Sequence, residues 1–210
     1  MPVKAIICDF GGVLTSPLMD AFVAFQDNTG ITLEQLGEAM THGTEAIGAN
    51  PLFELECGRI SEDRFLDILR DGFEENLGHR PDLHRFAETY MDALHPNEEL
   101  IAFMAELSKD HRMALLTNNV KEWEPLWRAK LPVDEIFETV VDSGFVGMRK
   151  PDPEIYELTL SRLDGVEPGE CLFVDDTLPN IDAARELGWL AVHHVDNATT
   201  IPEIRSLLDA

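Results

Sequence analysis

Five short apolar runs are the feature that most restricts how this chain can fold. Each run holds three or four residues: 5–8, 113–116, 139–141, 171–174 and 190–192. Runs of this length and composition are typical of strands that are buried on both faces of a parallel sheet. Helical patterns at 99–107, 154–163 and 181–187 lie between the runs. This alternation of strand and helix predicts a doubly wound, Rossmann-like α/β core.

One long stretch, residues 16–96, breaks the alternation because it shows helical periodicity and no convincing strand. For example, Phe65, Ile68 and Leu69 follow the possible helix N-cap Ser61 at helical spacing. We therefore expect a helical cap domain of residues 16–96, inserted into a core domain of residues 1–15 and 97–210. The two connections should be short hinges near residues 15–17 and 95–97.

The charge of the chain restricts its partners. Forty acidic and sixteen basic residues give a formal net charge of −24, and such a field repels nucleic acid and anionic membranes. A phosphorylated substrate would also be repelled, so its site needs a metal ion or local cationic groups. The first apolar run is broken by Asp9, and no run is long enough for a signal peptide or a membrane span. We therefore expect a cytoplasmic protein.

Cysteine and tryptophan give little functional information. The three cysteines, Cys8, Cys57 and Cys171, form no CxxC pair, and their odd number predicts reduced thiols that serve in packing. Trp123 and Trp127 are four residues apart, which favours packing and leaves an interface stripe as the alternative. The oligomeric state is not encoded in these patterns.

Polar residues gather where the predicted strands end. Asp9 follows the first run, Thr117 and Asn118 follow the second, and Asp175 and Asp176 follow the fourth. Each alone is most often a helix cap or a turn former. In an open parallel sheet, however, the carboxyl ends of the strands form the ligand site, so these residues are expected to meet.

In their order and spacing, these residues resemble the four motifs of the haloacid dehalogenase (HAD) superfamily, here at 8–15, 116–118, 149–153 and 173–180. The resemblance covers nearly the whole chain, since the helical insertion after the first motif is similar to the C1 cap of that family. It implies a hydrolase with Asp9 as nucleophile. It also implies Mg²⁺, bound by the side chains of Asp9 and Asp176 and the carbonyl of Gly11, with Asp175 binding it directly or supporting it from behind.

The same resemblance implies roles for the remaining motif residues. Thr117 and Lys150 are expected to be catalytic, and both are expected, with Asn118, to bind the phosphoryl group of a small phosphorylated substrate. Asn180 either caps the helix that follows the fourth motif or supports the site from behind, whereas Asp182 is expected at the surface.

Gly11 departs from the family pattern. Most HAD phosphatases have a second aspartate at this place, which protonates the leaving group and then activates water, and glycine cannot do either. The chain therefore resembles either a phosphatase with a substitute acid or an activated leaving group, or a non-catalytic protein that binds Mg²⁺ and phosphate. A haloacid dehalogenase is less favoured, because those enzymes lack an acidic pair such as Asp175 and Asp176. Six polar residues of the insertion or its hinges are candidate substitutes: Thr15, Ser16, His42, Glu45, Arg59 and His95.

Overall fold

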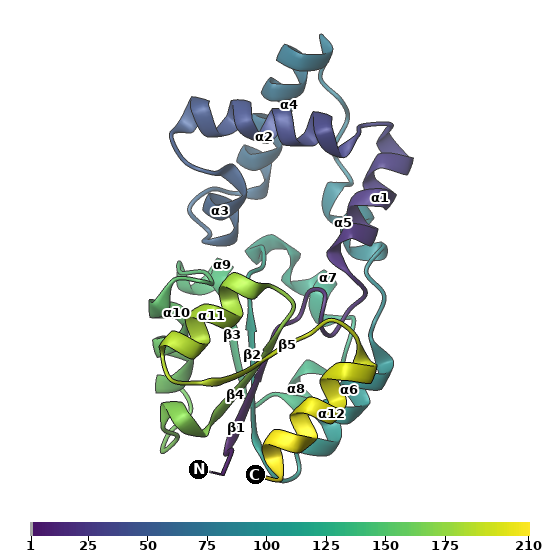
Figure 1. The fold of residues 1–210 in the computed structure, drawn as a ribbon. Helices are drawn as coiled ribbons and strands as arrows, with labels where there is room; N and C mark the ends of the chain where they lie inside the picture. The colour runs from purple at the N-terminus through teal and green to yellow at the C-terminus, as the bar shows by residue number, and fades with distance from the viewer. Residues whose placement is uncertain (1) are drawn as a thin grey trace.

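A five-stranded parallel sheet forms the centre of the protein in a computed structural model that describes residues 2–210 (Figure 1). Its order is β3-β2-β1-β4-β5. The strands are β1 (Ala5–Cys8), β2 (Arg112–Thr117), β3 (Thr139–Asp142), β4 (Cys171–Asp175) and β5 (Leu190–His193). In register, Ile7 lies between Ala114 and Phe173. Each predicted run lies inside an observed strand, so the predicted α/β core is confirmed.

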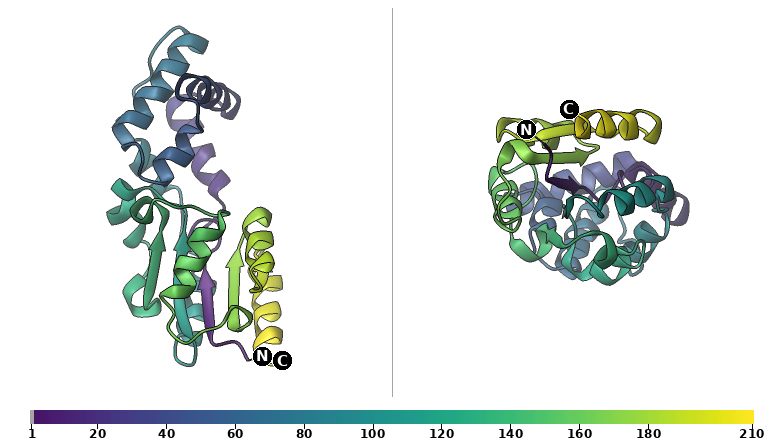
Figure 2. Two further views of the ribbon diagram at one scale, coloured as in Figure 1. Left: turned by 90° about the vertical axis from the view of Figure 1, so that its left-hand side faces the viewer. Right: turned by 90° about the horizontal axis from the view of Figure 1, so that it is seen from below.

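Helices cover both faces of the sheet, which Figure 2 shows from two further directions. Ile6 and Cys8 of β1 join one apolar cluster, and Ala5 and Ile7 join the other, because successive side chains of a strand point to opposite faces. The first cluster takes in side chains of α6 (Glu98–Leu107), α8 (Val133–Ile136) and α12 (Asn197–Leu208). The second takes in side chains of α10 (Pro153–Ser161) and α11 (Leu178–Glu186).

The remaining elements around the sheet are short. The loops hold η1 (Lys121–Trp123), α7 (Glu124–Arg128), α9 (Ser143–Val146) and η2 (Pro168–Glu170). Helix α12 was not predicted from the sequence. It begins after Asp196, whose carboxylate accepts a hydrogen bond from the Thr199 N–H at 2.8 Å and so caps the helix.

Five helices make up the stretch between β1 and α6: α1 (Leu18–Thr29), α2 (Leu33–Ile47), α3 (Pro51–Glu56), α4 (Glu62–Leu77) and α5 (Phe86–Asp92). Residues 16–96 are all described, and no strand longer than a single bridge occurs in them. Ser61 caps α4 as expected, because its hydroxyl accepts from the Arg64 N–H at 3.3 Å. Figure 1 shows these helices above the carboxyl ends of the strands. Their status as a separate domain stays a proposal.

The two connections to this helical segment run side by side. Thr15 and Pro96 form an antiparallel bridge, and the Ser16 N–H donates to the His95 carbonyl at 2.7 Å. The Asn97 N–H donates to the Leu14 carbonyl at 2.9 Å. The chain therefore enters and leaves the helical segment at one place, where both predicted hinges lie.

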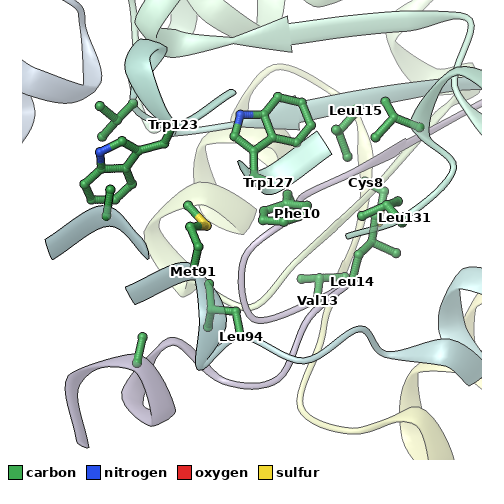
Figure 3. Packing of buried hydrophobic residues seen from close by; sticks show 14 of the residues in the cluster. Cys8, Phe10, Val13, Leu14, Met91, Leu94, Leu115, Trp123, Trp127 and Leu131 are labelled. Carbon is green, nitrogen blue, oxygen red and sulfur yellow. The ribbon is translucent and has the colours of Figure 1, made fainter. Parts of the chain in front are cut away.

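One apolar core joins the sheet to the helical segment. Phe10 packs on Trp127 with ring centroids 5.4 Å apart, and Met91 and Leu94 of the helical segment belong to the same cluster (Figure 3). Trp123 and Trp127 are both buried, which confirms that they pack. The three cysteines are likewise buried and free. No helix within residues 2–210 combines the length and the apolar character that crossing a membrane requires.

Candidate active site

The polar residues of the four motifs meet at one edge of the sheet. Asp9 directly follows β1, Thr117 ends β2, Asp175 ends β4, and Lys150 reaches them from the loop before α10. The neighbouring strands β2, β1 and β4 run parallel, so their carboxyl ends lie together. Asp9, Thr117 and Lys150 are almost fully buried, yet they line the same cavity.

Lys150 is the centre of the polar cluster. Its Nζ lies 2.8 Å from Asp9 Oδ1 and 2.6 Å from Asp175 Oδ2, while only 1% of its side chain is exposed. Burial by itself would lower the pKa of Lys150, but the carboxylates of Asp175 and Asp9 outweigh burial and raise that pKa. The lysine is therefore a permanent cation beside Asp9.

Asp175 accepts hydrogen bonds from several neighbours. In addition to Lys150 it accepts hydrogen bonds from the Thr177 N–H at 2.8 Å and from Asn180 Nδ2 at 3.0 Å. Asp175 is fully buried and does not line the cavity. Asn180 thus holds the Asp175 carboxylate and does not cap α11, which starts at Leu178 without a side-chain cap. Asp182 is exposed, as expected.

Asn118 holds the lysine loop in place. Its Oδ1 accepts from the Lys150 backbone N–H at 2.8 Å, and its Nδ2 donates to the Lys150 carbonyl at 2.9 Å. Because both ends of the side-chain amide are bound to Lys150, the side chain of Asn118 positions the lysine. The expected contact between Asn118 and the substrate stays a prediction, and the backbone of Asn118 is the part that could make it.

Gly12 makes room for the second metal-ligand candidate, Asp176. The φ of Gly12 is 76°, which lies in the left-handed region. A Cβ on Gly12 would lie 2.3 Å from Asp176 Oδ2. The Gly12 N–H donates to Thr15 Oγ1 at 3.1 Å, which fixes the turn after β1. The first motif therefore needs glycine at position 12 for conformation and for space.

Gly11, unlike Gly12, lies against an apolar side chain, that of Leu18. A Cβ on Gly11 would lie 2.9 Å from Cδ2 of Leu18, the first residue of α1. The leucine side chain thus takes part of the space that a longer side chain at position 11 would use. Leu18 and Gly11 both line the cavity.

The carboxylates repel one another because they are buried together. Burial raises the pKa of Asp9, with Asp175 and Asp176 adding to the rise and Lys150 opposing it. Burial, followed by the charge of Asp175, also raises the pKa of Asp176. One lysine therefore does not fully compensate three carboxylates.

This donor set fits a divalent cation that prefers oxygen ligands. Asp9, Asp175 and Asp176 each offer one ligand atom, and these atoms lie within 4.8 Å of one another. Three carboxylates and one ammonium leave a formal charge of about −2, which a Mg²⁺ ion would neutralise. The cluster therefore matches the predicted ion in chemistry and in charge.

A cavity of about 750 Å³ opens above this cluster. We call its polar end the floor, which consists of Asp9, Thr117, Lys150 and Asp176. We call the opposite end the roof, which consists of the lining side chains from residues 18–94. The roof is apolar apart from Glu56 and Tyr90, and includes Phe22, Leu36, Met40, Phe65 and Phe86.

The polar residues that the sequence suggested as substitutes for a second aspartate do not line the cavity. Thr15, Ser16, His42, Glu45, Arg59 and His95 all lie outside it. Glu45, Arg59 and His95 are exposed, whereas Thr15 is buried in the turn after β1. Within residues 16–96, the titratable side chains that do line the cavity are Glu56 and Tyr90. Sequence reasoning missed both.

Glu56 connects the roof with the loop that carries Lys150. Its carboxylate lies 2.8 Å from Arg149 Nε, and both side chains are about 15% exposed. Burial raises the pKa of Glu56, and Arg149 opposes that rise. The Arg149 guanidinium also lies 3.8 Å from the ring centroid of Phe53. Burial raises the pKa of Tyr90 as well, and Glu56 and Asp176 add to this effect.

Comparisons with known proteins identify the family to which the sequence is similar. The profile of the family described as haloacid dehalogenase-like hydrolase matches residues 3–188. The sesquiterpene phosphatase astK of Aspergillus oryzae is 29% identical over 209 residues, which cover 98% of this chain and 96% of that protein. Phosphatase MT3486 of Mycobacterium tuberculosis is 31% identical over 202 residues, which cover 91% and 87%.

Among solved structures, the HAD family enzyme bt-2542 from Bacteroides thetaiotaomicron, in complex with magnesium and inorganic phosphate, has a TM-score of 0.72 at 22% identity. The match covers 93% of this chain and 96% of that one. At this identity the likeness supports the fold.

Proposed function

This chain belongs to the haloacid dehalogenase-like hydrolases, and from that membership we propose that it is a Mg²⁺-dependent phosphatase that uses Asp9 as its nucleophile. The observation that carries the proposal is the pairing of Asp9 with Lys150 at 2.8 Å on the floor of a cavity. Two similar proteins of nearly the same length are named phosphatases, which supports the reaction class.

Each floor residue has a task in this reaction. An Asp9 carboxylate oxygen attacks the phosphorus, the bond from phosphorus to the leaving oxygen breaks, and an aspartyl phosphate forms. Lys150 keeps the carboxylate charge balanced, and its ammonium stabilises the phosphoryl oxygens together with Thr117. Water then attacks the phosphorus and gives a proton back to the group that protonated the leaving oxygen, and the bond from phosphorus to the Asp9 oxygen breaks, which releases inorganic phosphate and restores the Asp9 carboxylate.

Asp9, Asp176 and the carbonyl of Gly11 would hold Mg²⁺, with Asp175 fixing Lys150 and supporting the ion from behind. When bound, the ion supplies positive charge between the nucleophile and the anionic phosphoryl group. Asp175 already accepts bonds from Lys150, Thr177 and Asn180, and this is why we give it the supporting position.

The leaving oxygen needs a proton that Gly11 cannot provide. We assign this proton to the Tyr90 and Glu56 side of the roof, because these two are the titratable side chains of the helical segment that line the cavity. Burial raises the pKa of both, although Arg149 opposes the rise for Glu56 at 2.8 Å and favours the charged form of that carboxyl. Comparing Tyr90→Phe with Glu56→Gln separates them. The true donor is the one whose loss lowers kcat more for an alkyl phosphate than for acetyl phosphate, whose leaving group needs no acid.

The test is phosphate release from acetyl phosphate, p-nitrophenyl phosphate and an alkyl phosphate, with Mg²⁺ or with EDTA. Wild type should turn over with Mg²⁺ and lose activity in EDTA, and Asp9→Asn should lower kcat by roughly 10³-fold or more. Asp182→Asn, which changes an exposed carboxylate in the same way, is the matched control. Equal rates for Asp9→Asn and wild type would refute the proposed nucleophile.

Gly11 favours one alternative, a protein that binds Mg²⁺ and phosphate without turning substrate over. The decisive variant is Gly11→Asp combined with Leu18→Ala, because Leu18 fills the space beside position 11. If wild type is silent and the double variant gains activity, the binding protein is the correct function. If wild type is active, the added acid should raise kcat for alkyl phosphates by about 10² to 10⁴-fold.

A further inference from the structure

The cavity above the floor is too apolar for a sugar phosphate or a nucleotide. Its roof is lined mainly by aliphatic and aromatic side chains from all five helices of the segment. Leu18 and Phe22 come from α1, Met40 from α2, Phe53 from α3, Phe65 from α4 and Met91 from α5. A ligand that fills this space exchanges water mostly for carbon atoms, which favours an apolar ligand.

The roof also offers no free cation to a second anionic group. Residues 16–96 contain no lysine, and none of their five arginines lines the cavity. The one arginine that does, Arg149, is already paired with Glu56 at 2.8 Å. A diphosphate or a carboxylate in the roof would therefore be left without a counter-charge, in a protein with a net charge of −24.

A leaving group with several hydroxyls would also bind poorly in the roof. Its hydroxyls would lose water and find few partners among the roof side chains, where Tyr90 and Glu56 are the main polar groups. Each hydroxyl buried without a partner costs about tenfold or more in affinity. The polar contacts are concentrated at the floor, where one phosphoryl group would sit.

We propose that the substrate is the phosphate monoester of a long apolar alcohol, with the phosphate on the floor and the hydrocarbon in the roof. This inference rests on the proposed function for the reaction, but the recognition of the hydrocarbon stands on the lining of the cavity. A volume of about 750 Å³ lies within the range of cavities that enclose whole organic ligands.

A series of n-alkyl monophosphates from butyl to decyl tests the proposal. Beyond the shortest members, the pKa of the leaving alcohol stays nearly constant, so the series varies only apolar area. The value of kcat/KM should rise roughly fourfold per methylene until the roof is full, since each buried CH₂ contributes about 0.8 kcal/mol and a tenfold change corresponds to 1.4 kcal/mol. Glucose 6-phosphate and glycerol 3-phosphate should be much poorer substrates than octyl phosphate.

The matching n-alkyl phosphonates separate recognition from catalysis, because they bind without being hydrolysed. Their dissociation constants, measured by calorimetry with Mg²⁺ present, should fall with chain length by a similar factor per methylene. Turnover of acetyl phosphate together with a flat series in both assays would overturn the apolar substrate and leave the phosphatase intact. Absent turnover with steep phosphonate binding would overturn the phosphatase and keep the apolar site. Absence of both would overturn both.

Two roof residues allow the site to be changed without damaging the fold. Leu33 and Phe53 line the cavity yet remain 40% and 41% exposed, so polar substitutions there remove little core packing. Leu33→Ser and Phe53→Ser should each lower the gain from the longest chains by several-fold. Val23→Ser is the matched control, because Val23 is 51% exposed on α1 and lies outside the cavity. A chain-length dependence that is the same in all four proteins would count against a site in the roof.

Discussion

The floor and the roof of the cavity are held in place by different forces. On the floor, Asp9 is buried beside the single ammonium of Lys150, which also pairs with Asp175 behind the cavity lining. In the roof, Phe86 lies within 6.4 Å of the ring centroids of Phe25, Phe65, Tyr90 and Trp123. Charge compensation therefore determines the stability of the floor, and buried apolar area determines the stability of the roof. Changes at the two ends should therefore respond to different solution conditions.

The largest effect is expected from Lys150→Met. Removal of one partner of a buried ion pair leaves an uncompensated charge and costs about 3 to 5 kcal/mol of the free energy of unfolding. Urea denaturation in EDTA would measure it, with Lys109→Met as the exposed control. Added Mg²⁺ should restore part of the loss, because the ion binds only the folded site. A loss below about 1 kcal/mol would mean that the floor does not depend on its cation.

A loss of about 3 kcal/mol is expected for Phe86→Ala in the roof, since the ring leaves a cavity among four aromatic neighbours. Unlike the loss in Lys150→Met, this loss should be the same with EDTA and with Mg²⁺, once the shift that Mg²⁺ causes in wild type is subtracted. A loss that Mg²⁺ reverses would break the distinction between the two ends.

A smaller effect is expected where roof and floor meet. Glu56→Gln keeps an acceptor for Arg149 but removes the charge of a mostly buried pair, which should cost about 1 kcal/mol. Glu74→Gln is the matched control, because Glu74 pairs with Arg80 at 2.7 Å on the open surface, where such pairs contribute little. Equal denaturation midpoints for the two variants would show that the Glu56 pair does not hold α3 to the lysine loop.

An effect of similar size, visible only as a change with pH, concerns Asp142, which ends β3 at the same sheet edge but has no lysine partner. Burial raises the pKa of Asp142 to about 6, and its bond from the Gly144 N–H opposes the rise. A raised folded-state pKa gives stability that is complete below the unfolded value of 3.8 and is lost as pH rises through about 6.

Between pH 5 and pH 7.5, wild type should therefore lose about 1 kcal/mol more than Asp142→Asn. Urea denaturation at both pH values measures this, with Asp182→Asn as an exposed control that should behave like wild type. A pH dependence that survives in Asp142→Asn would assign it to another group.

The floor was predictable from sequence for a physical reason. Strand ends of a parallel sheet meet wherever the strands themselves are recognised, so Asp9, Thr117 and Asp175 could be brought together from short apolar runs alone. The Lys150 loop followed from its motif. The partners of each side chain, such as the two bonds from Asn118 to the Lys150 backbone, depend on loop geometry that no periodicity encodes.

The roof was not predictable in the same way. Which face of a helix lines a cavity depends on how five helices pack on one another, so choosing residues by chemical type led to His42, Glu45 and Arg59, which lie outside the cavity. Glu56 reaches the cavity from the last turn of the short helix α3. Helix α12 was missed because Pro202 lies inside it and weakens the helical pattern.

Trp123 gives the protein an optical reporter of its own. It is one of three tryptophans, and it lines the cavity, whereas Trp127 and Trp189 are buried outside the lining. Filling the roof with hydrocarbon changes the polarity around this indole and leaves the other two as an internal reference. Occupancy is therefore expected to shift intrinsic fluorescence, even in variants that have lost turnover, and a Trp123→Phe variant should lose that signal.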